Sequence, residues 1–342
     1  FGCLLLAGVI LAASADRAEA WGGHDVVMQA VVERLPGGFR GELSDEAIQK
    51  AIGPWSGYPD SFDGFDAEAE LIGPQGMALL DRYNVKRRYD LHHDWARPVI
   101  WLLLVDAIRA DRYEAALFWI AVLSHSTSDM SACNHDPIVH VATYDWSQID
   151  LELPGGEAFG RVAGRLDLKT ATETDADKKL FGQTVDAMCV ADDGRSARQT
   201  MFDIMLYGHR GAGFCAQHGY PLLKAAFDYA QTGNQEHRLA RQQHLAQLGA
   251  WGVVYTLRDT EVALRLAKRE FPVDMPALKA DYHAAVADWV ASRKLADEAL
   301  FAPILRPADD ETRGAIGVVL EPTWRMNESA LGFHQRVLAV AA

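Results

Sequence analysis

Histidine and aspartate residues gather after one apolar segment of the chain. His125 and Asp129 are separated by three residues, and His135 and His140 follow them. A spacing of i to i+4 places two side chains on the same face of a helix, one turn apart. An imidazole and a carboxylate in that position can share one zinc ion, which binds nitrogen and oxygen ligands at about 2 Å. Because an apolar segment precedes them, these residues indicate a metal site in the core of a helical bundle.

Further residues that could bind a metal precede this segment. They are Asp60 in the acidic loop 57–64, the adjacent His92 and His93, and His24 close to Trp21. Each also has an interpretation without a metal, since Asp60 could cap a turn, His92 and His93 could be surface residues at a helix start, and His24 could be an exposed residue in a first helical turn. His125 could likewise form hydrogen bonds within a core. In a chain with twelve histidines, one H-x3-D match is expected by chance. The order of the whole set is therefore more informative than any single motif.

That order resembles the zinc-dependent phospholipase C and single-strand nuclease superfamily, from Trp21 to His140. The shared pattern is an N-terminal Trp, a nearby His, an Asp in an acidic loop, a His, and then H-x3-D-x5-H after an apolar helix. The resemblance implies an all-α, multi-helix bundle of that type, which is secreted and binds up to three zinc ions.

The metal ligands that the resemblance implies form three groups. One ion would be bound by Trp21 and His24. A second would be bound by Asp60, His125 and either His92 or His93, with Asp129 as a bridge between these two ions. A third would be bound by His135, followed by His140. In that family the free amino group and the carbonyl of the N-terminal Trp bind the metal, which implies the same role for Trp21.

The third site departs from the family's pattern. The family completes it with a later His that is followed four residues further on by Glu or Asp. No later His of this chain has a carboxylate at that spacing, and His140 and Asp145 are one residue too far apart. The site is therefore either absent or completed by other residues. The candidates are His209, His218, His237 and His244.

These ligands predict a metal-dependent hydrolase that acts on phosphoric ester bonds. Clustered zinc ions lower the pKa of a bound water and neutralise the charge of a phosphate. We therefore expect in-line attack on a phosphate ester by zinc-bound hydroxide. Asp60 is the candidate catalytic residue, because a carboxylate beside the water can accept its proton.

The substrate is open at this level. The first expectation is a phospholipase C-like activity on phospholipid head groups or another phosphate ester, with transient contact with a membrane surface. The alternative is a secreted single-strand nuclease, for which Trp55, Tyr58 and Phe62 could supply stacking aromatic rings. A third interpretation is a non-catalytic secreted helical binding protein with one structural zinc ion or none. No stable protein partner is inferred.

The composition predicts a soluble globular protein with ordinary fractions of hydrophobic and charged residues. Of the 342 residues, 49% are hydrophobic and 23% are charged, and the formal net charge is −14. An acidic surface repels nucleic acid and anionic membranes on average, which makes nucleic acid the less favoured substrate. A local cluster of metal ions can reverse that field at the site itself.

The first twenty residues differ from the rest. Residues 4–13 are apolar and are followed by two A-x-A sites, a pattern typical of a signal peptide. We expect residues 1–20 to be a signal peptide, cleavage after Ala20 to make Trp21 the N-terminus, and the protein to be secreted or periplasmic. One disulfide could then form among Cys133, Cys189 and Cys215, in a pairing that the sequence leaves open.

Helical periodicity predicts the elements that must position the site. Helices are expected over about 24–35, 44–52 with Ser44 as N-cap, 98–110, 113–130, 239–255 and 278–289. The helix that ends in His125 and Asp129 is apolar on all sides, which places it at the centre of a bundle. Residues 146–198 are predicted to form an irregular excursion with a small helix or two. The rest of residues 21–342 is expected to form a single helical catalytic domain with little or no sheet.

Overall fold

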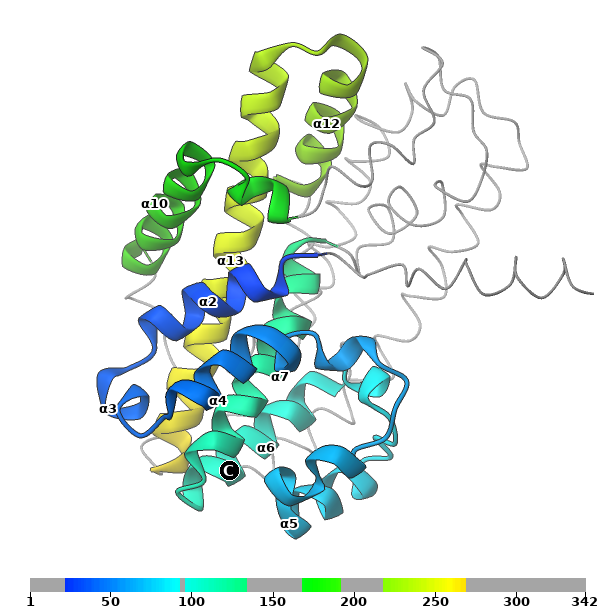
Figure 1. Cartoon of the computed structure of the whole chain (residues 1–342), viewed down its shortest axis with the longest axis vertical. Coiled ribbons are helices and arrows are strands. Elements are labelled where there is room, and N and C mark those ends of the chain that lie inside the picture. The colour runs from blue at the N-terminus through cyan, green and yellow to red at the C-terminus, as the bar shows by residue number, and fades with distance from the viewer. Residues whose placement is uncertain (1–21, 93–95, 134–167, 192–217, 269–342) are drawn as a thin grey trace, which may run out of the picture.

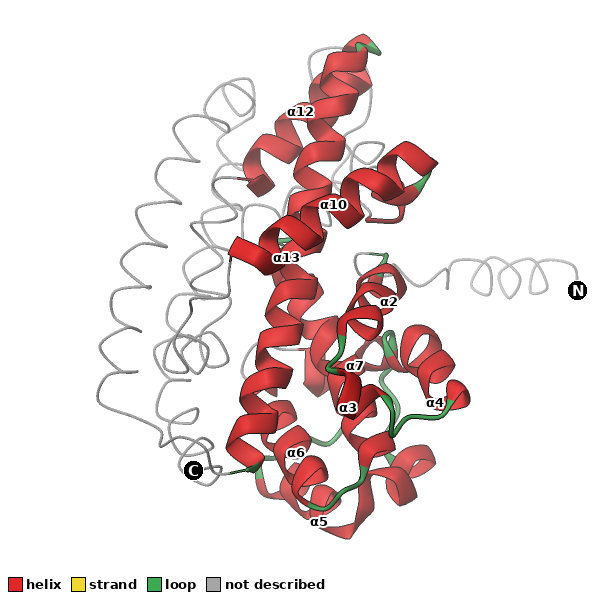
Figure 2. Cartoon of the chain, turned by 90° about the vertical axis from the view of Figure 1, so that its left-hand side faces the viewer, coloured by secondary structure: helices red, strands yellow, loops and turns green. Residues whose placement is uncertain are grey.

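The computed structural model describes residues 22–92, 96–133, 168–191 and 218–268 (Figure 1). Within these ranges the regular elements are all helices joined by loops, as Figure 2 shows, which confirms the all-α prediction. The α-helices are α2 (His24–Arg34), α3 (Gly37–Arg40), α4 (Asp45–Lys50), α5 (Ala69–Arg82), α6 (Arg97–Arg109), α7 (Tyr113–Ser131), α10 (Asp175–Ala191), α12 (Tyr220–Thr232) and α13 (Gln235–Ala267). Short helical turns are η1 (Ala51–Trp55), η2 (Tyr58–Asp60), η3 (Asp66–Glu68), η4 (Arg88–His92) and η7 (Leu168–Thr172).

Helix α7 lies at the centre of the bundle. Every residue from 115 to 131 is buried, and the helix packs against α6, α13 and α2. The predicted all-round apolar helix is therefore confirmed, and it continues through the polar stretch that carries His125 and Asp129. Trp101 of α6 and Trp119 of α7 are among the largest fully buried side chains. Burial of side chains of this size contributes most of the stability of such a core.

Helix α13 connects the two ends of the described structure. It contacts α10 and α12 as well as α7, α6 and α2, so it runs along the whole bundle in both views (Figures 1 and 2). Where it crosses α7, Gly252 faces Ser128 and Ser131. A Cβ atom on Gly252 would lie 2.9 Å from the Oγ of Ser131 and 3.4 Å from the Cα of Ser128. The lack of a side chain there lets α13 approach the part of α7 that carries the polar residues.

Several helix boundaries follow the sequence signals. Helix α2 ends at Arg34, just before Pro36. The Oγ of Ser44 accepts a hydrogen bond of 3.1 Å from the backbone N–H of Ala47, which confirms the predicted N-cap of α4. The helix predicted over 44–52 is interrupted at Gly53, directly after its expected end, although helical turns do not stop there. The chain continues as the π-type turn η1 to Trp55, and only Gly53 leaves helical geometry.

Part of the predicted irregular excursion is regular. Helix α10 occupies 17 residues of it and packs against α13. Its buried residues Asp177, Phe181 and Val185 are four residues apart and form a single narrow stripe. Because the fully buried residues form one narrow stripe, the apolar periodicity of this stretch is weak, and the sequence predicted only a small helix or two where a helix of 17 residues forms.

Some predictions lie outside the described residues. They are the signal peptide at 1–20, Trp21, His93, His135, His140, His209 and the helix expected at 278–289. In the described part of the chain no helix is long and apolar enough to cross a membrane. Cys133 is disulfide-bonded, whereas Cys189 is a thiol, so Cys189 does not take part in the predicted disulfide.

Candidate metal centre

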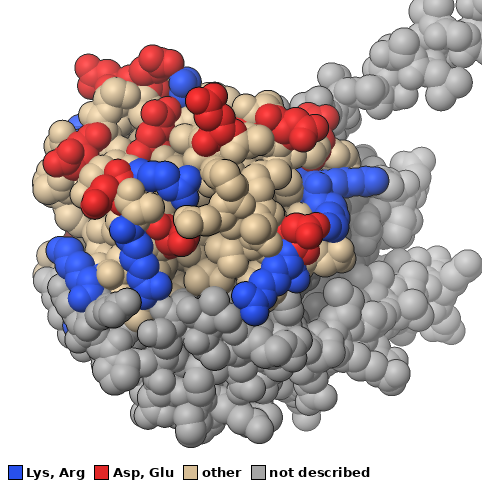
Figure 3. All heavy atoms as spheres, turned by 90° about the horizontal axis from the view of Figure 1, so that it is seen from below, with Lys and Arg blue, Asp and Glu red and all other residues tan. Residues whose placement is uncertain are grey.

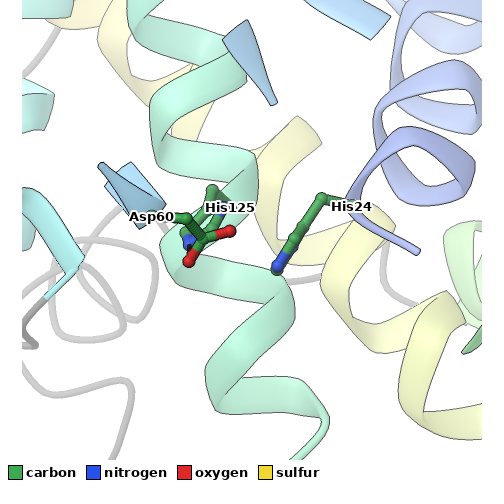
Figure 4. A group of neighbouring side chains, drawn as sticks. All are labelled: His24, Asp60 and His125. Atoms are coloured by element: carbon green, nitrogen blue, oxygen red, sulfur yellow. Dashed lines mark ion pairs between the residues drawn. The ribbon is translucent and has the colours of Figure 1, made fainter. Parts of the chain in front are cut away.

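Five predicted ligands, from four separate parts of the chain, meet at one side of α7. His24 is the first residue of α2, Asp60 ends the turn η2, and His92 ends the turn η4. His125 and Asp129 are one turn apart on α7 itself. Figure 4 shows His24 and His125 reaching toward the same region from their two helices, with Asp60 beside His125. The fold thus brings together residues that are as much as 105 positions apart in sequence.

Three ligand atoms form a nearly equilateral triangle. The Nε2 of His125 lies 3.2 Å from the Nδ1 of His92 and 3.3 Å from the Oδ2 of Asp129, and the last two atoms are 3.4 Å apart. A tetrahedral ion with ligands at about 2.0–2.1 Å requires its ligand atoms to be about 3.3–3.4 Å apart. The spacing of these three atoms therefore matches three corners of a zinc tetrahedron.

Asp60 faces the two histidines of this triangle. Its Oδ1 is 3.5 Å from the Nε2 of His125 and 3.7 Å from the Nδ1 of His92. The side chain of Asp60 is 33% exposed, whereas those of His125 and Asp129 are fully buried. The polar group is thus enclosed on the α7 side and reaches solvent on the Asp60 side.

Asp129 faces two groups of ligands with its two oxygens. While Oδ2 faces His92 and His125, Oδ1 lies 3.6 Å from the Nε2 of His24. The rings of His24 and His125 are stacked with their centroids 3.9 Å apart, and the Nε2 atom of each faces an oxygen of Asp129. A carboxylate placed in this way can bridge two metal ions, one bound to each oxygen.

The outer nitrogens of both stacked imidazoles have hydrogen-bond partners. The Nδ1 of His125 lies 2.7 Å from the carbonyl oxygen of Ser56, which can only accept a hydrogen bond. The Nδ1 of His24 lies 2.6 Å from the Oγ of Ser128, whose hydroxyl donates to the backbone oxygen of His125 at 2.9 Å. Both Nδ1 atoms therefore carry the proton in the neutral rings, and the Nε2 lone pairs point toward Asp129. Fixing the outer nitrogen in this way is the usual means of orienting a metal-binding histidine.

The electrostatics of the cluster favour a cation at its centre. Burial, followed by the neighbouring His125, lowers the pKa of His24 to about 3, so this ring is neutral at physiological pH. Burial opposes ionisation of Asp129, but the surrounding histidines outweigh it and lower the pKa of this carboxyl. Burial also opposes a charge on His125, yet the carboxylates of Asp129 and Asp60 raise its pKa. A buried anion that faces imidazole nitrogens is the donor set of a divalent transition metal.

Arg88 holds the loop that carries Asp60. Its guanidinium lies 4.3 Å from the ring centroid of Tyr58, and its nitrogens donate to Glu68 at 3.0 Å and to the backbone oxygen of Gly64 at 2.9 Å. The hydroxyl of Tyr58 donates to Glu68 at 2.7 Å, which closes the network. The turn that ends at Asp60 is therefore fixed by side-chain contacts. Arg88 belongs to no motif that the sequence makes visible.

Only one of the three aromatic residues proposed for base stacking is accessible. Trp55 and Tyr58 are buried and pack edge-on against Phe118, so they belong to the core and the prediction for them is wrong. Phe62 is 66% exposed and stacks on Tyr89 with centroids 4.5 Å apart. Tyr89 in turn lies parallel to the ring of His92, at 5.3 Å. Tyr89 was not predicted, although it precedes His92 by three residues, a spacing that places both on one side of a helical turn.

The described candidates for the third site lie elsewhere. The Nδ1 atoms of His218 and His244 are 3.3 Å apart between α12 and α13, and His237 lies 3.6 Å from Asp228. Among the described residues, the groups of three or more potential ligands involve only the cluster at α7. Among the described residues, the candidate ligands therefore gather at α7, and a third group of the family's type is not found there.

Comparison with known proteins identified no relative of this chain. No protein-family model matches the chain, and neither a curated protein nor a solved structure shows significant similarity to it.

Proposed function

We propose that the chain is a zinc-dependent hydrolase of phosphate esters. The observation that carries the proposal is the position of Asp129, whose two oxygens face two different sets of histidines at 3.3–3.6 Å. A bridged pair of ions is the arrangement that many phosphoesterases use to hold both the attacking and the leaving oxygen. The resemblance of the residue order from Trp21 to His140 supports the same activity.

Each residue of the cluster has a distinct role in this proposal. His92, His125 and Asp129 would hold one ion, and His24 would hold the other together with the second oxygen of Asp129. Zinc bound there would lower the pKa of a water molecule and neutralise the charge of a phosphate. Asp60 would remain next to solvent and accept the proton, since its carboxylate is the most exposed of the five side chains.

A catalytic ion fits the cluster better than a purely structural one. Structural zinc sites are closed by four protein ligands, whereas catalytic sites keep a position for water or substrate. His125 and Asp129 are fully buried, but His92 and Asp60 have 14% and 33% of their side chains exposed. The exposure falls on one side of the cluster, where a substrate could reach it.

The amino terminus at Trp21 is part of the proposal. His24 begins α2 three residues later, and the carbonyl of Gly22 accepts a hydrogen bond of 3.1 Å from the N–H of Leu168. Gly23 has a φ of 118° and lies so close to Leu168 that a Cβ there would be 2.7 Å away. Residues 22–24 are thus tied to the bundle beside the cluster. This supports Trp21 as a terminal ligand after removal of residues 1–20 from a secreted or periplasmic protein.

Phospholipid head groups are the proposed substrate, with transient contact with the membrane surface. Basic and acidic side chains are interspersed on the face in Figure 3, and the formal net charge is −14. Proteins that bind a long nucleic acid usually present a basic stripe instead. The exposed ring of Phe62 lies one stacked residue away from His92 and could contact an apolar surface.

Single-stranded nucleic acid is the second candidate substrate, because a base could stack on the exposed ring of Phe62. Phe62 stacks on Tyr89, and Tyr89 stacks on His92, so an aromatic series leads from the surface to a proposed ligand. Base stacking on aromatic side chains contributes about 1–3 kcal/mol per base and does not need a basic groove. Short single strands would suit this arrangement.

The test combines metal analysis with two activity assays on protein that begins at Trp21. Zinc would be counted by elemental analysis, and hydrolysis would be followed with phosphatidylcholine vesicles and with single-stranded DNA. The Asp129→Ala variant should lose zinc and all hydrolysis. The matched control is Asp186→Ala, which removes an exposed aspartate of α10.

The outcomes separate the three interpretations. Two or more zinc ions with activity on vesicles would support the phospholipase, whereas activity on DNA alone would support the nuclease. Zinc-loaded protein inactive on both substrates would favour a binding protein with structural metal. Full activity of Asp129→Ala would refute the proposed mechanism.

A further inference from the structure

A second histidine pair lies between α12 and α13, away from the cluster at α7. His218 directly precedes the N-cap of α12, Gly219, and His244 lies in the N-terminal third of α13. Both are partly buried where the two helices pack together. Their Nδ1 atoms are 3.3 Å apart, and their rings are tilted by 56° with centroids 5.6 Å apart. The proposed catalytic cluster does not use either residue.

The geometry of this pair is that of two ligands on one ion. Two imidazole nitrogens bound to a tetrahedral zinc ion at about 2.0–2.1 Å are about 3.3–3.4 Å apart, which is the observed separation. The tilt between the ring planes shows that the rings are not stacked on each other. We propose that His218 and His244 form a separate site for a divalent transition metal, zinc foremost, which shares no ligand with His92, His125 or Asp129.

The position along α13 separates the two sites. Gly252 is the residue of α13 that touches Ser128, which in turn bonds to His24 of the cluster. His244 precedes Gly252 by eight residues, and a rise of 1.5 Å per residue places it about 12 Å further along the helix axis. Ligands of one zinc ion are within about 4 Å of each other. An ion held by His244 would therefore be a different ion from the one held by His125.

Helices α12 and α13 pack against each other, and the site would lie where α12 begins. Among the described residues of α12, the buried apolar side chains are Leu222, Leu223, Ala225 and Ala226. An ion bound by one residue from each element would link the start of α12 to α13. Because the ion binds only where both histidines are in place, it stabilises the folded state by mass action. His218 and His244 are only partly buried, whereas His125 and Asp129 are fully buried, so an ion held by the pair would exchange with the medium more readily than one in the cluster at α7.

The experiment counts zinc at equilibrium in the full chain and does not depend on catalysis. Wild-type protein and the variants His218→Ala and His244→Ala would be dialysed against micromolar zinc and analysed for bound metal. The matched control is His237→Ala, which removes another α13 histidine that faces α12 across Asp228. We expect each test variant to bind one zinc ion fewer than wild type and the control to bind the full number. A conservative His244→Asn variant repeats the test with less change in packing.

Thermal unfolding gives an independent measure. Zinc added beyond the tightly bound ions should raise the Tm of wild type and His237→Ala by several degrees, and this increase should be lost in His218→Ala and His244→Ala. Equal zinc content in wild type and both test variants would overturn the proposal and leave two histidines that bond to each other. Loss of the same ion in His237→Ala would also overturn it, because the metal would then bind to surface histidines without a defined site. Whether the protein hydrolyses any ester does not affect these results.

Discussion

The Oγ of Ser128 lies 2.6 Å from the Nδ1 of His24, across the interface between α7 and α2. The serine hydroxyl donates to the backbone oxygen of His125, so its oxygen accepts from the imidazole. This contact turns the Nε2 of His24 toward Asp129. One serine on the central helix thus orients a ligand that begins another helix.

Replacement of Ser128 by alanine should therefore weaken metal binding without removing a ligand. Loss of such an outer contact costs about 10- to 100-fold in metal affinity. We expect Ser128→Ala to release zinc at a correspondingly lower chelator concentration, with its helical circular dichroism unchanged. The matched control is Ser124→Ala, one turn earlier on α7 and equally buried. Equal zinc retention by wild type and Ser128→Ala would show that the hydroxyl does not orient His24.

Replacement of Asp60 by asparagine separates metal binding from proton transfer. The amide keeps the size of the side chain and an oxygen that can face His92 and His125, but it cannot accept a proton. If Asp60 is the proton acceptor, Asp60→Asn should keep most of its zinc and lose about 100- to 10,000-fold in kcat. Zinc content and rate would be measured on the same preparation. Loss of zinc in parallel with the rate would indicate a ligand instead, and an unchanged rate would exclude both roles.

Replacement of Phe62 by alanine should distinguish the two candidate substrates. A base stacked on this ring would lose about 1–3 kcal/mol of binding, so KM for single-stranded DNA should rise while kcat changes little. On vesicles the same variant should bind more weakly to the lipid surface and keep its rate on a soluble short-chain substrate. The control is Leu239→Ala, which removes another exposed apolar side chain, from α13. If Phe62→Ala behaves like this control on all substrates, the aromatic series has no part in recognition.

The sequence could predict the part of the site whose residues are close together in the chain. His125 and Asp129 are one helical turn apart, and this distance is fixed by the helix alone. Asp60 and His92 were predicted from their order along the chain, and the fold brings them to the same point. The partners that orient these residues could not be predicted. Ser56 contributes a backbone carbonyl, which every residue possesses, and Ser128 is one of several hydroxyl residues on the same turns of α7.

Exposure could not be predicted from residue type. Trp55, Tyr58 and Phe62 are close in sequence and chemically alike, yet the first two pack on Phe118 and only the third is accessible. Whether each of these side chains is buried depends on its contacts with α7, which lies more than fifty residues further along the chain. For the same reason the length of helix α10 could not be predicted, since this helix packs against α13.

A buried ion pair holds α6 and α13 together behind the cluster. The guanidinium of Arg97 bonds to the carboxylate of Asp259, and it also donates to the Oγ1 of Thr127 on α7 at 3.1 Å. Both charged side chains are at most 1% exposed. Removal of one partner leaves a buried charge, so Arg97→Met should lower the free energy of unfolding by about 3–5 kcal/mol. The double variant Arg97→Met/Asp259→Leu should recover much of this loss in urea unfolding, and additive losses would argue against a coupled pair.

The pH dependence of stability tests the burial of His24. In the metal-free protein its pKa falls from 6.5 to about 3, mainly through burial, with a further contribution from His125. Between these values the unfolded chain binds a proton at this residue and the folded chain does not. The contribution of His24 to stability is therefore complete above pH 6.5 and decreases as the pH falls toward 3. The raised pKa of His125 acts in the opposite sense, because its contribution is complete below pH 6.5 and is lost as the pH rises.

The His24→Asn variant isolates this term, since His125 remains in both proteins. We expect the free energy of unfolding of metal-free wild type to fall between pH 6 and 4.5 more steeply than that of the variant, by up to about 1.4 kcal/mol per pH unit. Urea titrations at several pH values in a metal-free buffer would measure the difference. Repeating them with zinc should shift the wild-type loss to lower pH, because protons must then displace a bound ion. Parallel curves for the two metal-free proteins would mean that His24 is protonated inside the folded protein, and that its Nε2 is not held as a lone pair toward Asp129.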